Sequence, residues 1–236
     1  MQGIIMAAGR GSRIHHLTNG LPKSFLEIGG KKLIERNVDM LRNHGIEDII
    51  IVTGYRKDAF ENLFAGQKGI RLVFNPFYEQ ANVIGSYWTG MNYLKEDFVY
   101  LHADTICENA LFEDLLKTDG DIVLPVEAGA VDDEAMKVRL DSRKRVVEIT
   151  KNMPVEQAAG EFIGIAKIKQ NVINVLNHKT TELMVEKAFS EYFEAAIQKV
   201  LEAGKFDTVI LPTCGKFWAE VDFEEDYRRA VRLAKD

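Results

Sequence analysis

Short runs of β-branched and other apolar residues alternate with segments of helical periodicity through the first half of this chain. Between the runs, apolar residues recur at helical spacing, first at Leu33, Val38 and Leu41, and this alternation is typical of consecutive strand–helix–strand units. Such units predict an α/β fold, a mostly parallel sheet flanked by helices, with ligands at the carboxyl ends of its strands. The expected strands are residues 3–6, 48–53, 70–74, 98–102 and 121–126, and Ile84, Trp88, Met91 and Leu94 mark a second helical face.

Beyond Pro125, short strands joined by charged and glycine-containing turns replace the alternation. They predict a small antiparallel addition around residues 127–170 that forms one wall of a cleft. The sequence contains no linker or repeat, so we expect residues 1–236 to form a single domain. The expected elements are strands at 137–140, 146–149, 163–168, 209–211 and 217–221, a helix carrying Phe189, Phe193, Ile197 and Leu201, and a last helix from Glu224.

The composition narrows the range of partners. A formal net charge of −6 argues against a general polyanion-binding surface, so we expect no nucleic acid partner. Cys107 and Cys214 lie far apart without metal-ligand spacing, which is typical of thiols in a reducing compartment. No stretch reaches the roughly 18 apolar residues of a membrane span, and the N-terminus lacks a signal-peptide pattern. We therefore expect no membrane span and a cytoplasmic location.

The letters MAAGRGSR at residues 6–13 follow the first expected strand and begin a long glycine-rich loop, residues 7–32. A dinucleotide-binding turn would have a third glycine where Ile14 stands, and a P-loop would have a glycine before its lysine, where this chain has Pro22. What remains is a loop whose backbone amides can approach a triphosphate closely, because glycine has no side chain. The cations of this loop that can add to triphosphate binding are Arg10, Arg13 and Lys23.

Several stretches together resemble a known group of enzymes. AAGRGSR at 7–13, followed by LPK at 21–23, resembles the A-A-G-x-G-x-R and P-K signature of nucleotidyltransferases, which join a nucleoside triphosphate to a small phosphorylated acceptor and release pyrophosphate. WAEVDFEED at 218–226 is similar to their closing W-x-E-[IV]-D-x-x-x-D segment, and NVIGS at 82–86 resembles the N-x-I-x-S stretch of small cytidylyltransferases for phosphocholine or 2-aminoethylphosphonate. The resemblance extends over the whole chain and implies a Rossmann-like fold of the nucleotide-diphospho-sugar transferase type.

Nucleotidyl transfer brings an anionic acceptor oxygen to an equally anionic α-phosphate, so the site must suppress repulsion and align the two groups. The acceptor is already ionised, which agrees with the absence of a convincing Ser-His-Asp or Cys-His arrangement in the sequence. Asp104 and Asp222 follow expected strands, where their oxygens suit Mg²⁺, and the resemblance places the metal there. It further implies that Lys23 neutralises the α-phosphate and that Arg13 holds the leaving phosphates. His102 stands where some members have an aspartate, and we expect it to be a packed residue.

Candidate binding residues divide into two sets. A choline-like or aminoethyl head group needs aromatic faces or a carboxylate, which Trp88, Trp218 and Glu161 offer. Glu220 is a further candidate, and Lys151 is placed to grip the acceptor's phosphate. The residues expected at the nucleotide are Ala7, Ala8, Gly9, Gly11, Ser12, Arg13, Lys23, Asn82 and Ser86.

We therefore expect a Mg²⁺-dependent enzyme that transfers CMP from CTP to a small phosphate or phosphonate. One alternative keeps this chemistry on a sugar or polyol phosphate, and another is GTP-dependent guanylyl transfer to the molybdenum cofactor, which fits the closing segment less well. A third is a nucleotide-binding sensor without turnover, against which the joint presence of Lys23, Asp104 and Asp222 weighs. The expected partners are a nucleoside triphosphate and a small phosphorylated acceptor, and a homodimer through the antiparallel addition stays open.

Overall fold

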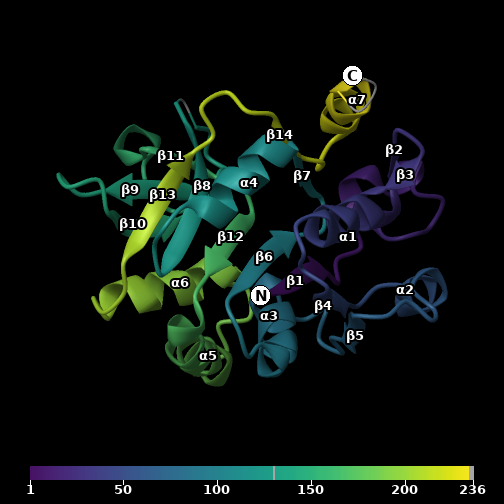
Figure 1. The fold of residues 1–236 in the computed structure, drawn as a ribbon, viewed down its shortest axis with the longest axis horizontal. Helices are drawn as coiled ribbons and strands as arrows, with labels where there is room; N and C mark the ends of the chain where they lie inside the picture. The colour runs from purple at the N-terminus through teal and green to yellow at the C-terminus, as the bar shows by residue number, and fades with distance from the viewer. Residues whose placement is uncertain (130, 234–236) are drawn as a thin grey trace.

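The structure, a computed structural model, describes residues 1–129 and 131–233, apart from the side chains of Ser12, His15, Arg232 and Leu233. A ten-stranded sheet has the order β10-β9-β11-β8-β12-β6-β1-β4-β5, with β13 beside β8 (Figure 1). Its parallel region is flanked by helices and confirms the expected α/β fold. In that region β1 (Gln2–Ala7) pairs with β4 (Asp48–Thr53) and β6 (Phe98–His102), and β4 pairs with β5 (Ile70–Phe74).

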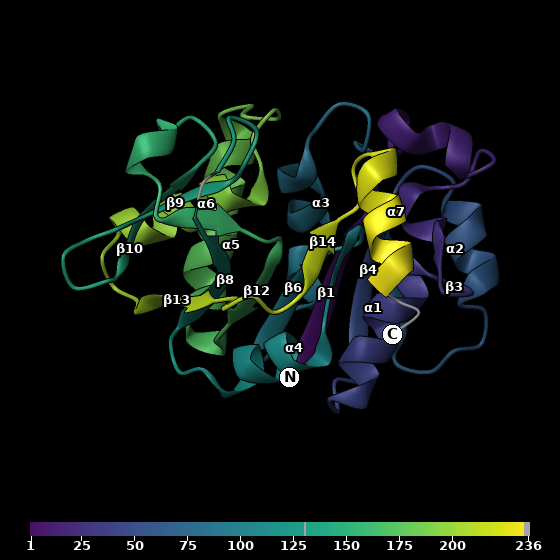
Figure 2. The same ribbon diagram turned by 90° about the horizontal axis from the view of Figure 1, so that it is seen from above.

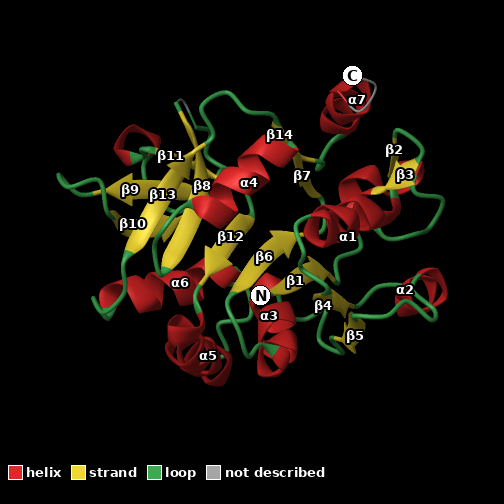
Figure 3. Cartoon of the chain, viewed as in Figure 1, coloured by secondary structure: helices red, strands yellow, loops and turns green. Residues whose placement is uncertain are grey.

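Each face of the sheet has its own apolar core, because successive side chains of a strand point to opposite faces. Ile4 and Met6 of β1 pack with α3 (Val83–Gly90), α5 (Gln170–Val185) and α6 (Phe193–Glu202). Ile5 and Ala7 belong to the opposite core, with α1 (Leu33–Asn43), α2 (Lys57–Leu63) and α4 (Asn109–Lys117). Figure 3 shows the helices of the first group below the sheet and α4 above it.

The antiparallel addition is continuous with this sheet. The strand expected at 163–168 is wrong in extent, because the chain forms two strands on either side of Gly164. This residue has φ +79°, and a Cβ here would lie 2.7 Å from His102 Nδ1, so both the turn and the packing require glycine. The strands of this half are β8 (Ile122–Ala128), β9 (Lys137–Leu140), β10 (Val146–Thr150), β11 (Gly160–Phe162), β12 (Ile165–Ile168) and β13 (Thr208–Pro212).

The helical segment of the C-terminal half also differs from expectation. The helix assigned to Phe189 begins only at Phe193, and Phe189 lies in the preceding loop with 37% of its surface exposed. The 16-residue helix α5 before it was not expected. The glycine-rich loop contains short helical turns, η1 (Ser12–Leu17) and η2 (Lys23–Phe25), and the hairpin β2 (Glu27–Ile28) with β3 (Lys31–Lys32). Two further turns are η3 (Met91–Tyr93) and η4 (Val155–Gln157).

A separate two-stranded sheet returns the C-terminal segment to the centre of the molecule. In it β14 (Trp218–Glu220) pairs with β7 (Thr105–Cys107), which follows β6 directly. The helix α7 (Glu224–Leu233) then lies beside the N-terminal elements, and the Tyr227 hydroxyl donates to the Glu27 carbonyl at 3.0 Å (Figure 2). Residues from both ends of the sequence therefore meet beside the first loop.

Candidate active site

Two adjoining cavities lie beyond the carboxyl ends of β1 and β6. The smaller has a volume of about 310 Å³ and is lined by the start of the glycine-rich loop and by α3. The larger, of about 570 Å³, lies between the antiparallel addition and the C-terminal segment. His102, Tyr192 and Glu220 line both cavities. This is the edge where the strand–helix pattern predicts ligands.

Lys23 joins the two cavities through its ion pairs. Its Nζ contacts Asp104 Oδ2 and Asp222 Oδ1, and Asp104 lines the smaller cavity while Asp222 lines the larger. Burial alone would lower the pKa of the Lys23 ammonium, but the charges of Asp104 and then Asp222 raise that pKa above its ordinary value. Burial would raise the pKa of Asp104, but Lys23 holds it below its usual range. Lys23 is therefore a cation and Asp104 an anion at neutral pH.

The local backbone explains how these residues meet. Pro22 precedes the turn that begins at Lys23, and the backbone of Gly11 packs against the Lys23 side chain. Gly11 has φ +69°, and a Cβ at this position would lie 2.4 Å from Lys23 Cβ, so only glycine fits. The Val221 amide donates to the Asp104 carbonyl at 3.0 Å, which aligns Asp222 with Asp104. The β7–β14 pairing thus brings the two carboxylates to one ammonium.

The carboxylates also have the character of a divalent metal site. Asp104 Oδ1 is buried, and among the described residues it has no hydrogen-bond partner. One donor atom from each of His102, Asp104 and Glu220 lies within 4.8 Å of the others. Hard carboxylate oxygens that face a common point are the ligands Mg²⁺ prefers. Asp104 and Glu220 therefore offer carboxylate oxygens for the cation that the resemblance implies, whereas Asp222, the other residue that the resemblance names, lies outside this group.

The smaller cavity contains only part of the expected nucleotide set. Ala8, Gly9, Asn82 and Ser86 line it, whereas Ala7 ends β1 in the core. Asn82 caps α3: its Oδ1 accepts from the Val83 amide at 2.8 Å, and its Nδ2 donates to the Ser190 carbonyl at 3.2 Å. The Ser86 hydroxyl accepts from Asn75 Nδ2 at 3.1 Å. The side chain of Ser12 lies outside the described residues.

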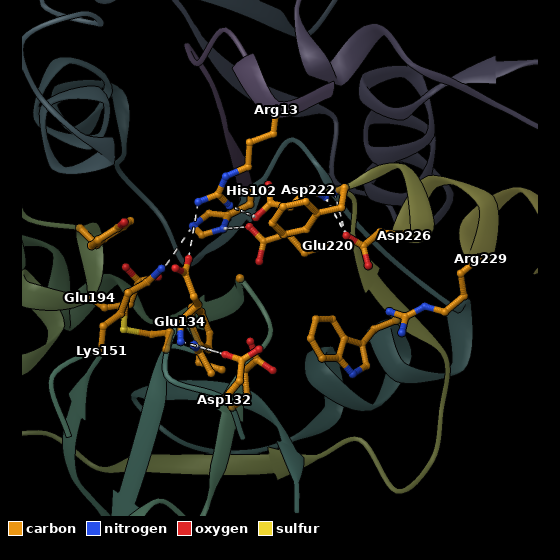
Figure 4. Close-up of a pocket in the computed structure, with 18 residues that line it drawn as sticks. Arg13, His102, Asp132, Glu134, Lys151, Glu194, Glu220, Asp222, Asp226 and Arg229 are labelled. Atoms are coloured by element: carbon orange, nitrogen blue, oxygen red, sulfur yellow. Dashed lines mark hydrogen bonds and ion pairs between the residues drawn. The ribbon is translucent and has the colours of Figure 1, made fainter. Parts of the chain in front are cut away.

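The larger cavity is acidic and aromatic, and Figure 4 shows carboxylates from several elements facing it. Glu161, Lys151 and Trp218, the residues predicted to bind the acceptor, all line it. The Lys151 ammonium lies 4.5 Å from the centre of the Tyr192 ring. Trp218 is held in place because its Nε1 donates to Glu127 Oε2 at 3.0 Å. The cavity therefore combines ring faces with negative charge.

Arg13 lines the larger cavity. Its guanidinium lies 3.5 Å from Glu134 and 3.7 Å from Asp222, and 5.0 Å from the centre of the Phe223 ring. Asp226 fixes the same segment, since its carboxylate accepts from the Asp222 and Phe223 amides at 3.2 and 2.9 Å. Arg13 thus connects the glycine-rich loop with both walls of the cavity.

Acidic side chains surround His102. Burial alone would lower the pKa of this imidazole, but the Glu220 carboxylate, 3.8 Å away, and the charge of Glu194, 3.7 Å away, raise it to about 9. Burial raises the pKa of Glu194. Burial, together with the charges of Glu220 and Asp132, raises the pKa of Glu161 to about 7. Glu161 therefore changes charge near neutral pH.

The structure places Trp88, which we expected at the acceptor, outside both of these cavities. Its ring lines a separate apolar cavity of about 250 Å³, together with Phe77, Met184 and Phe189. Trp88 and Ser86 both lie on α3, yet only Ser86 faces the nucleotide-side cavity. Helical spacing identified the helix but not the direction in which this large ring leaves it.

Sequence reasoning missed the carboxylate that lies deepest in the larger cavity. Glu194 is 1% exposed, and neither of its carboxylate oxygens has a hydrogen-bond partner among the described residues. A signal was present, because Glu194 lies three positions before Ile197 and so on the apolar face of α6. An acid at such a position is almost never fully buried unless it is paired with another group. Tyr192 and the loop residues Asp132 and Glu134 had no comparable pattern.

Comparison with known proteins identifies the family. A family model described as a MobA-like NTP transferase domain matches residues 3–204. The chain belongs to this family. A member of the MobA-like NTP transferase family is a nucleotidyltransferase, so the resemblance that the glycine-rich loop carries is confirmed. The matched region ends before the closing segment that begins at Trp218.

Individual relatives cover different parts of this chain. A bifunctional protein GlmU of Methanococcus maripaludis is 25% identical over 223 residues, which cover 94% of this chain and 51% of that protein. A choline-phosphate cytidylyltransferase of Streptococcus pneumoniae is 37% identical over 119 residues, 50% of this chain and 49% of that protein. The chain thus spans about half the length of these curated relatives.

A solved structure shows the shared fold over the full chain. The CTP:phosphocholine cytidylyltransferase of Streptococcus pneumoniae aligns with a TM-score of 0.82 and 24% identity, covering 98% of both chains. The nucleotide-diphospho-sugar transferase type of fold expected from the motifs is thereby confirmed. None of the helices in the described part of the chain has the length and apolar character needed to span a membrane.

Proposed function

We propose that this nucleotidyltransferase transfers CMP from CTP to a small phosphate or phosphonate that carries a cationic head group, as in phosphocholine or 2-aminoethylphosphonate. The observation that carries this proposal is the position of Lys23, between Asp104 at one cavity and Asp222 at an acidic, aromatic one. The cytidylyltransferase name of a relative that is 37% identical over half of the chain supports the choice of CTP.

In this reaction the acceptor oxygen forms a bond to the α-phosphorus while the bond to pyrophosphate breaks. Mg²⁺, held by Asp104 and Asp222, would supply charge neutralisation at the α-phosphate. Lys23, which contacts Asp104, would add a second positive charge at the same place. Arg13, which lines the larger cavity and pairs with Asp222, would hold the departing pyrophosphate, the role that the resemblance implies. The acceptor arrives ionised, so the residues need only bind, align and neutralise the two anions.

The larger cavity suits a cationic head group better than a neutral sugar. A quaternary or primary ammonium binds favourably over aromatic faces and beside carboxylates. Tyr192 and Trp218 supply the rings, and Glu161 and Glu194 supply the acids. The Lys151 ammonium lies over the Tyr192 ring, so this ring face is oriented for a cation–π contact.

The direct test is pyrophosphate release from the purified protein with Mg²⁺. Each of five nucleotides is tested with each of four acceptors. The nucleotides are CTP, UTP, GTP, ATP and dTTP, and the acceptors are phosphocholine, 2-aminoethylphosphonate, glucose 1-phosphate and inositol 1-phosphate. Release with CTP and an amino-headed acceptor is the expected result. Release confined to the sugar or inositol phosphates would overturn the proposed acceptor, and nucleotide binding without any release would overturn the enzymatic assignment.

Glu194→Gln should raise the KM for phosphocholine about tenfold or more, because a buried carboxylate beside the head group is lost, and tenfold corresponds to roughly 1.4 kcal/mol. The KM for CTP should stay unchanged. Glu191→Gln is the matched control, since Glu191 is an exposed acid three residues earlier. Steady-state kinetics of both variants decide the point, and an equal rise in both KM values would count against a specific role of Glu194 in acceptor binding.

The pH dependence of acceptor binding should follow Glu161. Below its pKa of about 7 this group is neutral, and above it the group is an anion, so the KM for phosphocholine should fall as the pH rises through 7. The acceptor's phosphate also titrates, near pH 6, so the comparison is between the wild type and Glu161→Gln. In Glu161→Gln, the fall in the KM for phosphocholine near pH 7 should be absent. An identical dependence of this KM on pH in both proteins would refute this role of Glu161.

A further inference from the structure

A buried lysine outside the catalytic group lies behind the wall of the larger cavity. Lys137, the first residue of β9, is 1% exposed. Its Nζ donates to the main-chain carbonyls of Asp133 at 2.8 Å, Ala135 at 3.3 Å and Lys151 at 2.9 Å. An ammonium has three donors, and Lys137 uses all of them on backbone.

The three carbonyls belong to two segments that form the cavity wall. Residues 132–136 supply Asp132, Glu134, Ala135 and Met136 to the cavity, and Lys151 lines it from the end of β10. Asp132 organises the same loop, because its Oδ1 accepts from the Glu134 and Ala135 amides at 2.9 and 2.8 Å. The loop is therefore held from the solvent side by Asp132 and from the interior by Lys137.

A second buried lysine gives a comparison within the same chain. Lys167 is 6% exposed, and its Nζ donates to the Leu116 carbonyl at 3.0 Å and also to the Thr118 carbonyl. Lys167 and its partners lie outside the residues that line either cavity. A buried ammonium needs such partners in place of water, and loss of the charge leaves the carbonyls unpaired. Both lysines thus donate to backbone carbonyls, but only the partners of Lys137 belong to the wall of the larger cavity.

We infer that Lys137 is a positioning residue for acceptor recognition: it fixes the loop 132–136 and the backbone of Lys151 as a rigid wall. This inference rests on the proposed function, in which that wall contacts the acceptor. The register of the sheet supports it, because Lys137 pairs directly with Glu161, another residue of the cavity. A wall held from behind keeps its shape without a side chain of Lys137 entering the cavity.

The first test does not depend on activity. Hydrogen–deuterium exchange is measured for the amides of 132–136 and 150–153 in the wild type, Lys137→Met and Lys167→Met. We expect exchange in these segments to rise about tenfold or more in Lys137→Met and to stay at the wild-type level in Lys167→Met. Unchanged exchange in Lys137→Met would overturn the inference, whether or not any acceptor is turned over.

The second test uses kinetics with phosphocholine and CTP. Lys137→Met should raise the KM for phosphocholine about tenfold or more, with the KM for CTP within about twofold, because the misplaced wall lines the larger cavity and not the nucleotide-side cavity. Lys167→Met should lower the melting temperature without changing the ratio of the KM for phosphocholine to the KM for CTP. Equal changes in both KM values in Lys137→Met would leave only a structural role and overturn the inference.

Should Lys137→Met not fold, Lys137→Gln takes its place in both experiments, since it retains an amide donor. Loss of folding in both Lys137 variants beside a folded Lys167→Met would also overturn the inference, because Lys137 would then support the whole fold and not the wall. If no acceptor is active, the proposed function fails, while the exchange experiment still decides the role of Lys137.

Discussion

Lys23→Met is expected to lower kcat by about 10²–10³-fold while CTP still binds, because one positive charge that acts on the transferring phosphate is removed. In a sensor the same change would mainly weaken nucleotide affinity, so kinetics and equilibrium binding together separate the two functions. Lys31→Met is the matched control, since Lys31 is 50% exposed and contacts Asp39 away from both cavities. A Lys23→Met enzyme with normal kcat would contradict the assigned role.

The same variant has a second measurable property. Lys23 Nζ contacts both Asp104 and Asp222, so its removal leaves two close carboxylates without their shared cation. We expect Mn²⁺, which shares the oxygen-ligand preference of Mg²⁺, to bind Lys23→Met more tightly than the wild type in the absence of nucleotide. Calorimetric titration measures this, and weaker binding in the variant would show that the two carboxylates do not form the metal site.

Asp104→Asn should lower kcat by about 10³-fold, because metal charge stabilisation of several kcal/mol depends on this carboxylate. The shape of the side chain is retained, and Lys23 keeps Asp222 as a partner, so the free energy of unfolding should fall by only about 1–3 kcal/mol. Urea unfolding and pyrophosphate release measure the two effects.

Asp119→Asn is the control for this substitution, because Asp119 pairs with Lys169 while 94% exposed. It should change neither kcat nor Mn²⁺ affinity. If Asp104→Asn bound Mn²⁺ as the wild type does but was inactive, the carboxylate would act through Lys23 alone, and the proposed metal role would be wrong.

Strands were the most predictable part of the fold. The strands Asp48–Thr53, Ile70–Phe74 and Phe98–His102 match the expected strands residue for residue, because each is a short run dominated by β-branched and other apolar residues. The helix Gln170–Val185 was missed because its apolar residues lie among asparagine, histidine and threonine, which favour helices weakly. The apolar spacing of four residues extends back to Phe189, but the backbone becomes helical only at Phe193. Phe189 therefore fits the apolar pattern without belonging to the helix.

The candidate site was predictable where short motifs marked it. Lys23 and Asp222 belong to such stretches and Asp104 follows a strand, and all three meet in space. Glu194 belongs to no motif, and its position on the apolar face of α6 was the only sign of its burial in the sequence. Trp88 shows the converse, because aromatic character alone does not specify which cavity a ring enters.

The contact between Lys23 and Asp222 joins residues 199 positions apart in the sequence. At about 5–20 residues per second, a growing polypeptide carries the glycine-rich loop for roughly 10–40 s before Asp222 is added. During that interval Lys23 can pair with Asp104, but β7 still has no β14 beside it. A chain interrupted before residue 218 can therefore form the parallel strands and the loop, yet it lacks half of the carboxylate pair around which the site is built.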